Sequence, residues 1–151
     1  MADTIREQII AAYATRLASW TTGNGFNYSC GGTVGRAISH IEDSDLPACN
    51  LVPGEEDAEQ RYGQNVCQMD VKLEAFSKIT TENRSKVQEK LLGDAIKIMT
   101  DPSVTVTTKI EEIAYSGGGP ASVEKSENEI TAISARFRIK YNTLIGNPYS
   151  Q

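Results

Sequence analysis

The sequence is poor in the groups that most often carry acid–base or nucleophilic catalysis. Its single histidine is His40, and no serine or cysteine near it lies in a recognisable nucleophile motif. A mechanism that uses imidazole would have to use this residue, and a structural role for it is favoured. Acidic residues are so numerous in exposed-looking segments that no catalytic carboxylate pair can be singled out. We therefore assign no catalytic residue and expect a protein that is not an enzyme.

The usual signatures of metal and phosphate sites are also missing. Cys30, Cys49 and Cys67 are an odd number without CxxC spacing, so free, buried thiols are favoured over a zinc site or a disulfide. The acidic residues from 55 to 59 do not follow the ligand spacing of a calcium loop, and a solvated loop is favoured there. The glycine-rich stretch 31–35 lacks the lysine of a phosphate loop. We expect no cofactor and no metal.

Long apolar runs and a surplus of basic residues are absent as well. No stretch approaches the roughly 20 apolar residues that a membrane-spanning helix needs, and the N-terminus does not resemble a signal peptide. We expect synthesis in the cytoplasm and no membrane contact. The 15 Lys and Arg residues are outnumbered by 20 Asp and Glu, for a net charge of −5. Stable binding to nucleic acid is disfavoured, because affinity for phosphates depends on a surplus of positive charge.

The patterning that is present predicts one globular domain spanning residues 1–151. Amphipathic helices are indicated from 4 to 20, where Thr4 to Glu7 form a capping-box pattern, and from the cap candidates at 80–83 to about Thr100. The clearest strand is 67–75, where apolar and polar residues alternate. Further strands are predicted at 26–30, 33–41, 48–52, 104–115 and 130–141.

The order of these segments predicts an α+β fold: a mainly antiparallel β-sheet with two amphipathic helices packed on one face. Two polar segments rich in proline, glycine or charge, at about 53–64 and 116–128, are predicted to be mobile loops.

Opposite charges fall on predicted neighbouring strands. The last strand carries Arg136, Arg138 and Lys140 on its polar face, and the central strand carries Asp70 and Glu74. Cross-strand pairing within the chain, worth about a few tenths of a kcal/mol per pair, is favoured over a basic stripe that meets an acidic neighbouring subunit. Candidate assembly contacts from the two loops and this strand are Glu55, Glu56, Asp57, Gly117, Gly118, Gly119, Arg136, Arg138 and Lys140.

Three stretches carry a resemblance to a known family. They are the end of the first helix with Thr22 to Asn27, the step Asp45-Leu46-Pro47-Ala48 before Gly54-Glu55-Glu56, and Phe137 to Thr143 followed by Gly146-Asn147-Pro148-Tyr149. In layout and in these short phrases, over nearly its whole length, the chain resembles the tail-terminator (tail-completion) proteins of long-tailed bacteriophages. None of the phrases is a chemical signature.

The resemblance implies a structural virion protein that is assembled in the host cytoplasm. It would form a homo-oligomeric ring, typically a hexamer, at the head-proximal end of the tail. The ring would cap the tail tube, end its polymerisation and provide the head–tail joining surface. The implied partners are other copies of the chain, the tail tube protein and a head–tail connector or neck protein. DNA would only pass through, and the negative net charge fits such a channel.

Two alternatives stay open at this point. The first is another neck or tail component, such as a head–tail stopper, a minor tail protein or a tube subunit. The second is a small ligand-binding or enzymatic domain with a pocket around His40.

Overall fold

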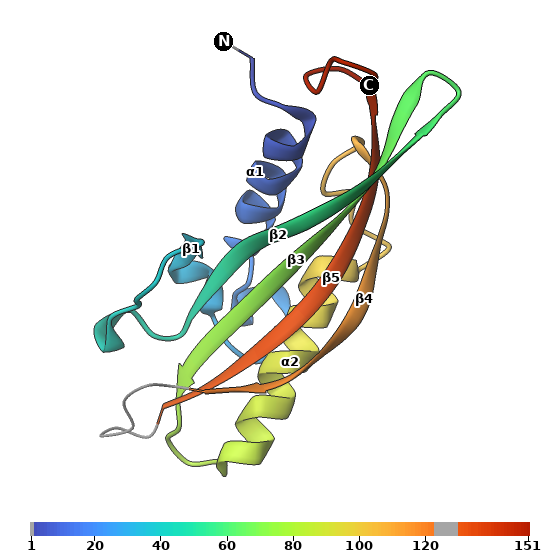
Figure 1. The fold of residues 1–151 in the computed structure, drawn as a ribbon. Helices are drawn as coiled ribbons and strands as arrows, with labels where there is room; N and C mark the ends of the chain where they lie inside the picture. Colours follow the sequence, from blue (N-terminus) through green and yellow to red (C-terminus); the bar gives the residue numbers. More distant parts are fainter. Residues whose placement is uncertain (1, 123–129) are drawn as a thin grey trace.

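The computed structural model describes residues 2–122 and 130–151, and it has the predicted α+β architecture (Figure 1). Helices α1 (Ile5–Leu17) and α2 (Arg84–Thr100) cover one face of a five-stranded sheet. Its strands are β1 (Val34–Arg36), β2 (Ala48–Arg61), β3 (Gln64–Lys78), β4 (Ile110–Ala121) and β5 (Ile130–Leu144). Their order is β1-β2-β3-β5-β4, and every neighbouring pair is antiparallel except β1 and β2. The fold class, with a single domain, is confirmed.

Both predicted helices begin at the caps that the sequence indicates. The Thr4 hydroxyl accepts a hydrogen bond from the Glu7 amide (3.0 Å), and the Asn83 side chain accepts one from the Lys86 amide (2.9 Å). Such bonds satisfy amides that have no partner inside the helix. Helix α2 ends at Thr100, as predicted. Helix α1 ends at Leu17, slightly earlier than the predicted residue 20.

The prediction of a loop over residues 53–64 is wrong. Residues up to Arg61 belong to β2 and pair with β3. The two strands are joined by Tyr62 and Gly63, whose φ angles of 50° and 79° are those of a two-residue type I′ turn. The acidic residues have the sequence pattern of a loop because their side chains are exposed, so no apolar alternation marks this end of β2.

Other strand predictions need smaller corrections. Residues 116–121 of the second predicted loop belong to β4, and residues 123–128 lie outside the described residues. Strand β4 begins at Ile110 instead of residue 104. Residues 26–30 form no strand, and the predicted strand 33–41 is reduced to Val34–Arg36.

The core lies between the helices and the inner face of the sheet. Alternate residues of β3 and β5 point toward the helices and pack with the apolar face of α1 and with Trp20; they include Met69, Val71, Leu73, Ala135, Phe137 and Ile139. The three cysteines are free and buried, as predicted. Burial raises the pKa of the Cys49 thiol to about 12 and raises the pKa of Cys30 well above its usual range.

A buried carboxylate joins α2 to the segment that follows α1. Asp94 is only 3% exposed and accepts hydrogen bonds from the Trp20 indole (3.2 Å), the Asn27 amide (2.9 Å) and the Tyr28 amide (3.1 Å). The Asn27 side chain donates a further bond of 2.9 Å. Burying a charge is costly unless it is hydrogen-bonded in this way. The role of Asp94 is not predictable from the sequence, because its partners are more than sixty residues away along the chain.

We expect Asp94→Ala to lower the free energy of unfolding by about 2–4 kcal/mol, because four donors would lose their acceptor. Denaturant unfolding followed by Trp20 fluorescence measures this change. Glu89→Ala is the matched control, since Glu89 is an exposed residue of the same helix, and we expect it to change stability by less than about 0.5 kcal/mol. Equal effects of the two substitutions would contradict the assigned role of Asp94.

We expect the native thiols to react slowly with Ellman's reagent at mildly alkaline pH, because burial raises the pKa of all three cysteines and the thiolate is the reactive form. Unfolding in denaturant should release three reactive thiols. Rapid reaction of the folded protein would contradict their burial.

Candidate assembly surface

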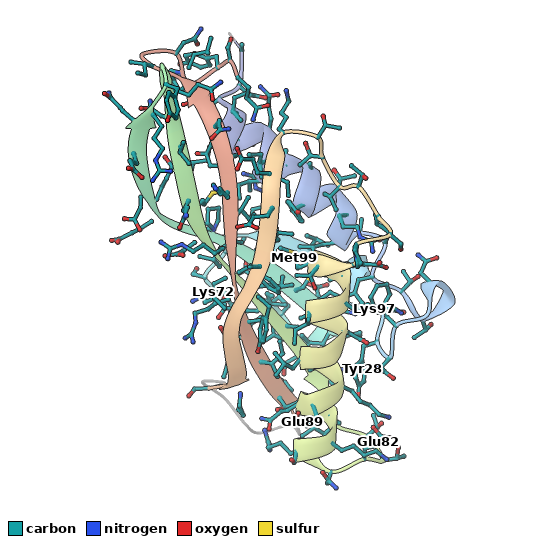
Figure 2. All side chains as sticks on the ribbon, turned by 90° about the vertical axis from the view of Figure 1, so that its right-hand side faces the viewer. Tyr28, Lys72, Glu82, Glu89, Lys97 and Met99 are labelled. Carbon is teal, nitrogen blue, oxygen red and sulfur yellow. The ribbon has the colours of Figure 1, made fainter. Side chains whose placement is uncertain are left out.

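The charged residues gather on the face of the sheet that the helices leave uncovered, here called the outer face. Figure 2 shows Lys72 on this side, opposite α2. In the strand register, Asp70 lies beside Arg138, Lys72 beside Arg136 and Gln68 beside Lys140. The outer face therefore holds charged side chains of β3 and β5 in adjacent rows, as predicted.

Two of the three basic residues of β5 form ion pairs inside the chain. Arg138 lies 2.7 Å from Asp57 and 3.5 Å from Asp70, and Lys140 lies 3.4 Å from Glu111. All of these side chains are more than a third exposed, and water weakens ion pairs at such positions. Each pair therefore contributes about 0.2–1 kcal/mol at most. Cross-strand pairing, the interpretation favoured from the sequence, accounts for both residues. Asp57 is engaged in the same way.

Glu56 is also engaged inside the chain, but on the inner side of the sheet. It lies opposite Met69 in the register and accepts hydrogen bonds from the Tyr141 hydroxyl and from Arg6 (3.3 Å). Arg6 also donates to the Gly54 carbonyl at 2.5 Å. Burial, together with the neighbouring Glu56, raises the pKa of Tyr141. Glu56 thus connects β2 to β5 and to α1.

Bulges interrupt β2 and β4, the two strands that flank the central β3–β5 pair. In β2, the register shifts between Pro53 and Glu56, so Gly54 and Glu55 together face Asp70. A Cβ at Gly54 would lie 2.9 Å from the Asp70 carbonyl oxygen, so the approach requires glycine. In β4, the register shifts between Ile110 and Glu112 and again between Tyr115 and Gly117, and the second shift is here called the β4 bulge. Bulges bend and twist a strand locally, and these two lie at the same level on opposite sides of the sheet, since Pro53, Val71, Phe137 and Tyr115 are aligned in one row.

Two of the three glycines in β4 are close to β5. A Cβ at Gly117 would lie 2.8 Å from an Arg136 guanidinium nitrogen, and one at Gly118 would lie 2.6 Å from the Ser134 carbonyl oxygen. At Gly119 a Cβ would meet nothing within 4 Å. Gly117 and Gly118 are thus needed for close packing, and Gly117 leaves room for the Arg136 side chain.

A depression of about 410 Å³ lies on the outer face between the two bulges. It is lined by Val52, Gly54, Asp70, Val71, Lys72, Ser116 and Arg136. Lys72 and Arg136 are direct cross-strand partners, and like charges in this position repel each other. Lys72 is 3.9 Å from Glu74, whereas Arg136 has no ion pair or hydrogen bond within the described chain. Of the three basic residues of β5, Arg136 is therefore the one whose charge is left uncompensated within the described chain.

A second surface lies where the β2–β3 turn and the C-terminal segment meet, here called the hairpin end (Figure 1). Tyr62 is fully exposed at the turn, and the pairing of Gln64 with Leu144 brings the end of β5 beside it. Leu144, Ile145 and Tyr149 are also exposed. The Pro148 carbonyl accepts a hydrogen bond from the Ile5 amide (2.8 Å), which fixes the C-terminal segment against α1.

His40, around which the enzymatic alternative was placed, lies on the surface of the described chain. His40 is 74% exposed and lies 3.3 Å from Glu42, and it lines neither the depression on the outer face nor a smaller depression near α2. The smaller depression, of about 160 Å³, adjoins Tyr28, Glu82 and Lys90, and there Lys90 pairs with Glu82 at 2.7 Å. Tyr28 and Glu82 are labelled in Figure 2. Within the described ranges, no group of three or more His, Cys, Asp or Glu side chains is placed to hold a metal ion. No helix in these ranges is long and apolar enough to cross a membrane.

Fold and surface together define a small α+β protein with one covered and one charged sheet face. No protein-family model and no curated protein matches the sequence. The structure is similar to a chain in the virion of a native gene transfer agent (GTA) particle, with a TM-score of 0.52 and 13% identity. The alignment covers 88% of this chain and 93% of that chain. At this identity the similarity establishes the fold, and it does not by itself establish a function.

We expect Glu56→Ala to lower the free energy of unfolding by about 1–2 kcal/mol, because Tyr141 and Arg6 would lose a charged acceptor. Glu55→Ala should change it by less than about 0.5 kcal/mol, because Glu55 is exposed and makes no contact of this kind within the described chain. Denaturant midpoints of the two variants measure the difference. A result in the reverse order would mean that the β2 register is not the one described.

Proposed function

We propose that this chain is a structural protein of a phage-like virion and acts as a tail terminator. The observation that carries the proposal is the fold similarity to a chain of the GTA virion over nearly the full length of both chains. The resemblance of the sequence to tail-terminator proteins supports the more specific role. Copies of the chain would form a ring that caps the tail tube, ends its polymerisation and provides the surface to which the head is joined.

The surfaces of the chain suit a protein that works by assembly. A closed ring needs two different patches on each subunit that are complementary to each other, and the sheet carries the acidic Glu55 in the β2 bulge and the basic Arg136 of β5 beside Gly117 of β4. The hairpin end offers a separate apolar surface with two exposed tyrosines, Tyr62 and Tyr149. Tyrosine is enriched in protein interfaces. We propose that this end contacts the tail tube.

The remaining partners and the location follow from the same role. Copies of the chain would bind one another, the tail tube protein and a head–tail connector or neck protein at the head-proximal end of the tail. DNA would pass through the ring, and a chain with a net charge of −5 would not retain it strongly. No catalytic step is part of the proposal.

Another neck or tail component is the second candidate, because the fold similarity is to a chain of a virion particle and does not distinguish the role within it. The behaviour of tube ends separates the two. A terminator caps tubes and stops their growth, whereas a tube subunit adds to their length.

We expect the purified protein, added to polymerising tail tube protein, to shorten the tubes and to appear as a ring at one end of each tube in electron micrographs. The double variant Tyr62→Asn, Tyr149→Ser should remain folded and should weaken capping by at least about tenfold, since aromatic anchors often contribute more than about 1–2 kcal/mol to an interface. Asparagine is chosen at position 62 because it tolerates the positive φ there.

Ile38→Ser is the matched control for this experiment, because Ile38 is also exposed but lies near β1, away from the hairpin end. It should leave capping unchanged. Tubes that incorporate the protein along their length, or that ignore it, would overturn the terminator role.

A further inference from the structure

Two opposite charges remain uncompensated among the candidate contacts. Glu55 lies in the β2 bulge and is exposed, and Arg136 lies on β5 beside the β4 bulge. Neither makes an ion pair or a side-chain hydrogen bond within the described chain, whereas Glu56, Asp57, Arg138 and Lys140 all do. Internal pairing therefore explains the other charges but not these two.

The two charges lie toward opposite sides of the sheet. Beyond Leu51 no described strand pairs with the outer side of β2, so Glu55 is at a free edge. The Arg136 guanidinium lies beside Gly117 of β4, which is the other edge strand. The two bulges flank the same row of the sheet, so the charges differ little in level along the strands.

We propose that neighbouring subunits of the ring are joined by Glu55 of one chain and Arg136 of the next. The Glu55 carboxylate approaches over the β4 bulge, past Ser116, and binds the guanidinium in the outer-face depression, with Lys72 beside it. An incoming carboxylate also relieves the repulsion between Lys72 and Arg136, which are cross-strand partners. This inference rests on the proposed ring and names the contact that closes it.

A second copy of the chain is the partner because both halves of the contact are present once on each subunit, toward opposite edges. Such a contact is heterologous, and a small difference in level between its two halves favours a closed ring over a helical filament. An exposed charge pair of this kind specifies which surfaces meet and in what register.

The contact is confined to the bulges and does not extend the sheet from one subunit to the next. Pro53 and Pro120 supply no amide donor on the two edges, and bulges interrupt the pattern of backbone hydrogen bonds. Near the hairpin end both edges are acidic, with Glu59 on β2 and Glu112 on β4. Full pairing of the strands would bring like charges close together.

Charge reversal tests the contact, with oligomer mass measured by native mass spectrometry over a range of protein concentrations. Glu55→Lys and Arg136→Glu should each weaken ring formation at least about tenfold, because each places like charges together. We expect Arg136→Glu to remain folded, because the introduced carboxylate would lie opposite Lys72 and pair with it. Loss of the fold would therefore not explain weaker ring formation by this variant. Glu89→Lys and Lys78→Glu are matched controls, exposed and without ion pairs in the described chain, and should assemble as the wild type does.

Two combinations sharpen the test. The double variant Glu55→Lys, Arg136→Glu should recover ring formation, because the pair is restored with its charges exchanged. An equal mixture of the two single variants should also recover it, because every contact joins opposite charges when the two chains alternate around the ring. Because the double variant restores the wild-type net charge, the controls Glu89→Lys and Lys78→Glu, which change the net charge by the same amounts at other positions, exclude a general charge effect.

The outcomes separate this inference from the proposed function. Wild-type rings that are insensitive to both reversals, or single variants that neither combination rescues, would overturn the Glu55–Arg136 contact and leave the terminator role standing. If the double variant and the mixture both recover ring formation but no ring caps a tube, the result would support the contact and overturn the terminator role. A wild-type chain that stays monomeric in solution and on tubes would overturn both.

Discussion

The buried Asp94 carboxylate is the constraint on which the arrangement of the helices depends. Asp94 lies on α2 and accepts hydrogen bonds from the segment between α1 and β1. The two helices make few direct contacts, so this segment and the inner sheet face hold them in place together. With both helices fixed on the inner face, the outer face and the hairpin end remain free for other molecules.

The parts of the fold that could be predicted are the helices and strands with one buried face, because apolar residues then recur at regular intervals in the sequence. Helix α2 and strand β3 were correctly placed because one face of each is buried and the other is polar. The half of β2 that leads to the turn at Tyr62 was not predicted, because its side chains are exposed on both faces and no apolar alternation distinguishes it from a loop. The turn at Tyr62 and Gly63 also lacks the Asn-Gly or Asp-Gly pair that most clearly marks a two-residue hairpin.

The candidate surface was partly accessible from the sequence for the same reason. Alternation on β5 placed Arg136, Arg138 and Lys140 on one face, and the structure adds the ion pairs that engage two of them. Which charge stays uncompensated depends on the bulges that shift the register of β2 and β4, and the amino-acid composition does not reveal a bulge reliably. The hairpin end was not found at all, because it joins Tyr62 to residues near the C-terminus only through strand pairing.

The chain combines a fold found in a phage-like virion with free surfaces that suit assembly, and the proposed position at the end of the tail tube is the central claim. A cryo-electron microscopy reconstruction of tail tubes bound by the purified protein tests this claim most directly. We expect one closed ring at the tube end, with the hairpin end against the last tube subunits and the β2 edge of each chain beside the β4 edge of the next. Copies spread along the tube wall, or a hairpin end that faces away from the tube, would contradict it.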